Sequence, residues 1–139
     1  MKKSIVLDCS MTLRWCFKDE ANSISDKTLE YVRRHGAIVP SLWGLEVTNG
    51  LLQAKKRGRI SLDGILEFLE LFAKLPIRSL PVTVADCFTT VFPLAQQHNL
   101  SSYDASYLYL ALRERLFLAT CDNSLQSAAK QLGVLWIVK

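Results

Sequence analysis

The sequence lacks the features that mark membrane, secreted or disordered proteins. It has no apolar run close to the ~20 residues that a membrane-spanning helix requires. The amino-terminal apolar run, residues 4–7, is stopped by Asp8, well short of a signal-peptide core. There is no low-complexity tract, internal repeat or linker, and charged residues, at 22%, are close to the globular average. We therefore expect an ordered, soluble, cytoplasmic protein without membrane association.

The residues of zinc and disulfide sites are also scarce. No two cysteines form a CxxC pair, and the two histidines lie far from the cysteines in the sequence, which argues against a zinc site. A disulfide framework is not expected without secretion. We expect four reduced thiols, which are Cys9, Cys16, Cys87 and Cys121.

The chain does contain enough apolar sequence for one domain. Its 139 residues are 50% hydrophobic, which predicts a single domain, 1–139, with a buried core. Lysine and arginine (17) outnumber aspartate and glutamate (13), so the net charge is +4. This basic excess is compatible with a polyanionic partner such as RNA, but many small basic proteins bind none.

Short apolar segments alternate with longer segments of helical periodicity. We expect strands at 4–7, 37–39, 77–80, 116–120 and 134–138. We expect helices at 25–35, 42–57, 61–74, 82–98, 101–112 and 123–132, with Pro93 kinking or splitting the fourth. Because no hairpin signal joins the strands, the pattern predicts a three-layer α/β/α sandwich with a mostly parallel sheet of about five strands.

Four acidic residues stand where the predicted strands end or helices begin. Asp8 and Asp122 follow strands, and Glu46 and Asp104 lie in the first turns of helices. Functional groups of parallel α/β folds gather at the carboxyl edge of the sheet, so we expect the four acids to converge there. Crowded carboxylates are stable only with bound cations or retained protons, and an oxygen-rich site suits Mg²⁺ or Mn²⁺.

Each acid also has a purely structural interpretation. Asp8 and Asp122 are suitable helix N-caps, and Asp104 follows Ser101 at the spacing of a capping box. Glu46 would be favoured by the positive end of its helix dipole. Taken singly, these interpretations are at least as good as a metal site. Their convergence on one edge of the sheet favours the metal site.

The acids belong to motifs that together resemble a known family. The motifs Asp8-x-Ser10, Glu46-x-x-Asn49, Tyr103-Asp104-Ala105 and Thr120-x-Asp122-x-x-Leu125 are similar in order and spacing to those of PIN-domain ribonucleases. Further segments are similar to the VapC-type toxins of toxin–antitoxin pairs, and these are Arg14-Trp15 with Glu20, Pro40-Ser41-Leu42, Arg57-Gly58-Arg59-Ile60, Leu75-Pro76-Ile77 and Ala128-Ala129 with Gly133-Val134. The resemblance spans essentially the whole chain.

The resemblance implies a Mg²⁺-dependent endoribonuclease, with Mn²⁺ as an alternative ion, that acts as the toxin of a type II toxin–antitoxin system. The implied catalytic and metal-binding residues are Asp8, Glu46, Asp104 and Asp122. Of these, Asp8 and Asp104 would bind the ion directly, and Asp122 directly or through water. The residues implied to hydrogen bond around them are Ser10, Asn49 and Thr120.

The resemblance also implies partners, namely an RNA substrate, a cognate antitoxin protein and a second copy of the chain. The segment 101–112 is apolar on nearly every side, as expected of a helix in a core or in a homodimer interface. Asn123 stands where some relatives carry another acid, which leaves one or two metal ions open.

A basic run at the end of the helix that carries Glu46 has two interpretations. It would bind RNA phosphates near the site, or it would be a cationic helix end before a glycine stop. Its residues are Lys55, Lys56, Arg57 and Arg59. The alternative to an enzyme is a non-catalytic PIN-like scaffold that binds RNA or a protein, although such a scaffold has no need of four clustered acids.

Overall fold

The computed structural model describes residues 3–138, which fold around a four-stranded parallel sheet of order β3-β2-β1-β4. The strands are β1 (Ile5–Leu7), β2 (Ala37–Pro40), β3 (Ile77–Leu80) and β4 (Leu118–Ala119). The helices are α1 (Cys9–Arg14), α2 (Ser23–His35), α3 (Leu42–Lys56), α4 (Leu62–Lys74), α5 (Val84–Asp86), the π-helical η1 (Cys87–Val91), α6 (Phe92–His98), α7 (Ser102–Glu114) and α8 (Asn123–Gln131). Within this described part, none is long and apolar enough to cross a membrane.

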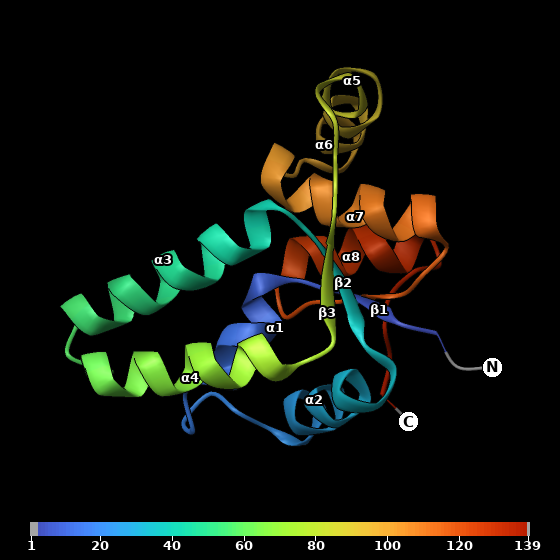
Figure 1. The fold of residues 1–139 in the computed structure, drawn as a ribbon. Helices are drawn as coiled ribbons and strands as arrows, with labels where there is room; N and C mark the ends of the chain where they lie inside the picture. The colour runs from blue at the N-terminus through green and yellow to red at the C-terminus, as the bar shows by residue number, and fades with distance from the viewer. Residues whose placement is uncertain (1–2, 139) are drawn as a thin grey trace.

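Helices cover both faces of the sheet, so the predicted three-layer α/β/α fold is confirmed (Figure 1). Val6 and Ile38 pack against α7 and α8 on one face. Ile5 and Leu7 pack on the other face with Met11 of α1 and residues of α2. Alternate strand residues point to opposite faces. This is why the whole run from 5 to 7 is apolar.

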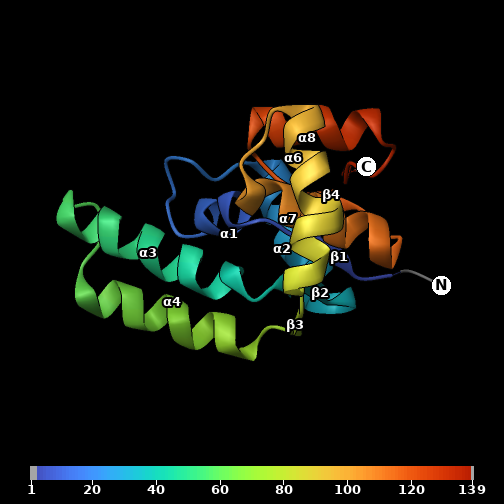
Figure 2. The same ribbon diagram turned by 90° about the horizontal axis from the view of Figure 1, so that it is seen from above.

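The helices α3 and α4 form a hairpin that projects from the sheet (Figure 1, Figure 2). Gly58, with φ of 72°, lies in the turn between them, in the left-handed region that glycine adopts without strain. Near the sheet, α1 packs closely against α3. A Cβ atom on Gly50 would stand 2.6 Å from Leu13 Cδ1, so the absence of a side chain at this position permits the approach.

The prediction of about five strands is wrong by one. Residues 134–138 make a single parallel bridge, between Leu118 and Leu135. Its hydrogen bonds join Leu118 N to Val134 O (2.7 Å) and Trp136 N to Leu118 O (2.9 Å). Because β4 is only two residues long, it offers too little backbone for a full strand to pair along.

The predicted helix at 82–98 is observed from 84 to 98 without a break, and Pro93 does not split it. It consists of α5, the π-helical η1 and α6, so the hydrogen-bonding pattern becomes π-helical directly before the turn that contains the proline. The short helix α1 was not among the predicted helices. It begins directly after Asp8 and places that residue at the carboxyl end of β1.

Candidate active site

Asp8 is the most buried of the four predicted acids, with 4% of its surface exposed. Its Oδ2 accepts hydrogen bonds from Ser10 Oγ (2.6 Å) and Thr120 Oγ1 (2.7 Å). Ser10 Oγ also accepts a bond from Cys121 N (2.9 Å), which ties the end of β1 to the end of β4. Burial raises the pKa of Asp8, and the two hydroxyl donors oppose that rise.

Glu46 of α3 is held by a tyrosine that the sequence analysis did not assign to the site. The hydroxyl of Tyr107, a fully buried residue of α7, donates to Glu46 Oε1 at 2.5 Å. Burial raises the pKa of Glu46, the Tyr107 hydrogen bond lowers it, and the charges of Asp8 and Asp104 raise it further. Tyr107 lies three residues after Asp104 and therefore on the same face of α7, but this spacing does not indicate its contact with Glu46.

Asp104 lies in the first turn of α7, at the same edge of the sheet. The cap of α7 is Ser101, whose Oγ accepts from the backbone N of Asp104 at 3.1 Å. Burial raises the pKa of Asp104, and the negative charges of Asp8 and Asp122 raise it further. Its carboxylate therefore lies within electrostatic range of two other acids.

Asp122 is the N-cap of α8, as its structural interpretation predicts. Its Oδ2 accepts from Leu125 N at 2.8 Å, and its own backbone N donates to Thr120 Oγ1 at 3.1 Å. The same carboxylate raises the pKa of Asp8 and of Asp104 through its charge. Asp122 thus combines a capping role with membership of the acidic cluster, which we define as Asp8, Glu46, Asp104 and Asp122.

The ligand atoms of the acidic cluster are of the type that a hard divalent cation prefers. All four side chains are carboxylates, the ligands that Mg²⁺ and Mn²⁺ prefer. A cation would favour the charged forms of Asp8, Glu46 and Asp104, whose pKa values are raised by burial and by the charges of neighbouring acids. Within residues 3–138, however, no three His, Cys, Asp or Glu side chains are placed so that they could enclose an ion. Mg²⁺ commonly binds through one or two carboxylates and completes its shell with water, so it does not need a closed set.

Asn49 lies one turn after Glu46 on α3 and is exposed. Among the hydrogen bonds of the described residues, none joins Asn49 to Glu46. Its implied role in positioning Glu46 stays a prediction.

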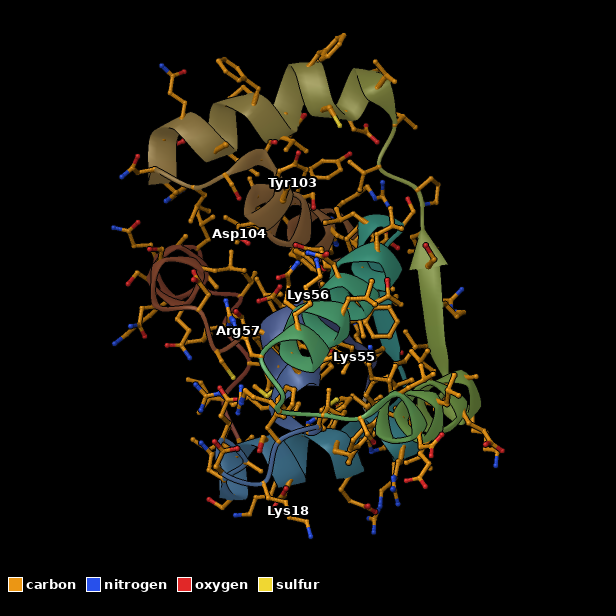
Figure 3. All side chains as sticks on the ribbon, turned by 90° about the vertical axis from the view of Figure 1, so that its left-hand side faces the viewer. Lys18, Lys55, Lys56, Arg57, Tyr103 and Asp104 are labelled. Atoms are coloured by element: carbon orange, nitrogen blue, oxygen red, sulfur yellow. The ribbon has the colours of Figure 1, made fainter. Side chains whose placement is uncertain are left out.

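The basic residues at the end of α3 differ in their surroundings. In Figure 3, Lys55 and Arg57 lie on opposite sides of the helix end, with Lys56 between them. Arg59 forms salt bridges with Asp19 (3.1 Å) and Glu20 (3.3 Å), and its guanidinium lies 4.3 Å above the ring of Phe17. The charge of Arg59 is therefore already compensated within the chain.

No family model and no curated protein matches the chain. Among solved structures, the chain is similar to PAE2754 from Pyrobaculum aerophilum, with 22% sequence identity and a TM-score of 0.69 over 95% of each chain. At this identity the likeness shows the fold alone, a mixed α/β architecture shared over nearly the full length of both chains.

Proposed function

We propose that the chain is a Mg²⁺-dependent endoribonuclease whose site is the acidic cluster. The observation that carries the proposal is the buried carboxylate of Asp8, which is held by two hydroxyls. The charge of Asp122 raises the pKa of Asp8, and the charge of Asp8 raises the pKa values of Glu46 and Asp104. Such a cluster is destabilised by its own repulsion, and a bound cation would remove this cost. The motifs of the sequence supply the reaction class, hydrolysis of an RNA phosphodiester.

The acids would divide the work between them. Asp8 and Asp104 would hold the ion, with Asp122 contributing directly or through water, and Glu46 would hold a water of the ion or a second ion. When bound, the ion supplies positive charge that stabilises the phosphate and leaving oxygen. Mn²⁺ would serve in place of Mg²⁺ because both favour oxygen ligands.

Hydroxyl groups would keep the acids in position. Ser10 and Thr120 both bind Oδ2 of Asp8, and Tyr107 binds Oε1 of Glu46. Partners of this kind fix the orientation of a ligating side chain, and their loss commonly costs 10–100-fold in affinity or activity.

The toxin role, the antitoxin, the homodimer and the cytoplasmic location are proposed on the resemblance in the sequence. The apolar helix that suggested a dimer is buried within a single chain, since Tyr107, Leu108, Leu110 and Ala111 of α7 all have 0% exposure. Burial of α7 therefore supports the core interpretation and gives no separate argument for a dimer.

The second candidate is a scaffold that binds RNA or a protein without cleaving RNA. It is favoured by one observation, that no three metal-binding side chains of residues 3–138 are placed to enclose an ion. An RNA cleavage assay distinguishes the two functions. The enzyme would cleave RNA when a divalent cation is present, whereas the scaffold would not cleave RNA at all.

The test is RNA cleavage by the purified chain with Mg²⁺ and with a chelator. We expect cleavage that depends on the ion and is abolished by Asp8→Asn, which keeps the size of the side chain. Asp63→Asn is the matched control, since Asp63 is exposed on α4 and is not among the charges that shift the pKa values of Asp8, Glu46 and Asp104. Full cleavage by Asp8→Asn would show that the site is wrongly assigned.

A further inference from the structure

A cavity of about 550 Å³ adjoins the acidic cluster. Its lining includes Ser10 and Asp122 from the site, three arginines, Arg14, Arg57 and Arg59, and Glu20, whose carboxylate pairs with Arg59. This volume lies within the usual range of small-molecule sites. We propose that the cavity binds one nucleotide of the RNA next to the cleaved bond, with Arg14 and Arg57 as its phosphate ligands. This inference rests on the proposed function.

The arginines of the cavity are not equivalent. Arg59 is paired with Asp19 and Glu20. Arg14 donates only to a backbone carbonyl, that of Glu20, at 3.4 Å. Among the salt bridges of residues 3–138, none involves Arg14 or Arg57. Two guanidinium groups without a carboxylate partner therefore border the cavity, and this geometry suits the oxygens of a phosphate.

Arg14 lies on the same cavity as the edge of the sheet that carries the acids. Its side chain shares the lining with Cys121 and Asp122, which follow β4. An acidic cluster repels the RNA backbone, so phosphate binding beside it requires cations at close range. The cavity supplies these cations and shares part of its lining with the site.

The position of Arg57 allows binding in the cavity to be distinguished from binding to a general basic surface. Lys55 and Lys56 belong to the same helix end but do not line the cavity, and Lys55 lies on the side of α3 opposite Arg57 (Figure 3). If RNA were attracted only by the net charge of the helix end, Lys55 and Arg57 would contribute alike. If RNA binds in the cavity, Arg57 contributes more.

The experiment measures binding of a labelled single-stranded RNA of mixed sequence by fluorescence anisotropy. All variants carry Asp8→Asn, so the RNA is not cut. We expect Arg14→Gln and Arg57→Gln each to weaken binding about 10-fold, roughly the loss of one charge-assisted contact. The slope of log affinity against log salt should fall by about 0.7 for each arginine removed. Thermal unfolding checks that each variant is folded.

Three further variants sharpen the result. Arg33→Gln is the matched control, because Arg33 is exposed in the last turn of α2, before β2 begins at the opposite edge of the sheet. It should leave binding unchanged. Arg14→Lys keeps the charge and should retain the salt slope. Lys55→Gln should weaken binding less than Arg57→Gln. An equal loss of affinity would overturn the proposal that RNA binds in the cavity and would show that the net charge of the helix end attracts it.

Failure of this inference differs from failure of the proposed function. If the unmodified chain cleaves RNA while Arg14→Gln and Arg57→Gln bind RNA as tightly as their parent, the cavity is not the nucleotide site and the enzyme assignment stands. If the unmodified chain neither binds nor cleaves RNA, both are refuted.

Discussion

At the scale of single residues, the acidic cluster is held by hydroxyl donors. Two hydroxyls bind one oxygen of Asp8, and the hydroxyl of Tyr107 binds Glu46. A donor that binds a carboxylate favours the ionised form, so these bonds act against the effect of burial on the pKa values. The acids are therefore kept both in place and closer to their charged, ion-binding state.

The Tyr107→Phe variant removes one such donor and leaves the ring in the core. Glu46 is only partly buried and can turn to water, so we expect stability to fall by no more than about 1 kcal/mol. Cleavage should fall about 10-fold because Glu46 loses its fixed position. RNA affinity, measured on the Asp8→Asn background, should not change.

The matched control for this prediction is Tyr109→Phe, which removes the same atom from the same helix. Tyr109 packs against Arg113, with the guanidinium 5.4 Å from its ring. Among the hydrogen bonds of the described residues, none joins its hydroxyl to Glu46, which is bound by Tyr107. Equal loss of cleavage in both variants would assign the effect to α7 as a whole and not to the Tyr107 hydroxyl.

The acids could be foreseen from the sequence, whereas Tyr107 could not. Asp8 and Asp122 follow apolar strand segments, and parallel strands bring their carboxyl ends to one edge. The bond from Tyr107 to Glu46 joins residues 61 apart and depends on how α7 packs against α3. Local spacing carries no information about that contact.

At the scale of secondary-structure elements, Asp122 combines two roles that a pair of substitutions can separate. Asparagine is as good an N-cap as aspartate, so Asp122→Asn keeps the cap of α8 and removes only the charge. We expect it to unfold at nearly the same temperature as the parent but to cleave RNA more slowly. Asp122→Ala should also lose about 1 kcal/mol of stability.

Thermal unfolding and RNA cleavage of the two variants provide the check. Parental cleavage by Asp122→Asn would show that the residue is a cap and nothing more. A large loss of stability in Asp122→Asn would show that its charge is needed for folding, contrary to the mutual repulsion within the cluster.

The order of elements was predictable, but the lengths of the shortest ones were not. The predicted strand at 116–120 shrinks to Leu118–Ala119, and the last strand shrinks to a bridge at Leu135. Thr120 has strand-like chemistry, yet its hydroxyl is used to bind Asp8. The backbone carbonyl of Thr120 accepts a bond from the Gln126 side chain (3.0 Å) and not from a neighbouring strand, so the strand ends earlier than the hydrophobic pattern alone predicts.

At the scale of the whole molecule, the raised pKa values make stability depend on pH. Asp8, Glu46 and Asp104 have pKa values above those of the unfolded chain, so the folded state binds protons more tightly. Without divalent cations, their contribution to stability is complete below the unfolded pKa values and is lost as pH rises through the folded ones. We expect the unfolding temperature in a chelator to rise on mild acidification from neutral pH.

The Asp8→Asn variant isolates this effect from other titrating groups, such as the partly exposed Asp86, whose pKa is lowered. It removes the most buried carboxylate and one source of repulsion on Glu46 and Asp104. Its stability should vary less with pH than that of the parent, as measured by thermal unfolding over the same buffers. If the two proteins showed the same dependence of unfolding temperature on pH, burial and repulsion of the carboxylates would not limit the stability of the chain.

Divalent cations should also relieve the repulsion between the carboxylates, by binding to their charged forms. At neutral pH, Mg²⁺ or Mn²⁺ that binds only the folded chain raises its stability by RT ln(1 + [ion]/Kd), so the unfolding temperature should climb with ion concentration. The scaffold alternative predicts no rise beyond that produced by NaCl of equal ionic strength. Because ions and protons compete for the same carboxylates, the gain from Mg²⁺ should shrink as pH falls through the raised pKa values. Asp8→Asn should lose most of the gain at every pH, which ties the effect to the acidic cluster and excludes general binding of cations to the surface.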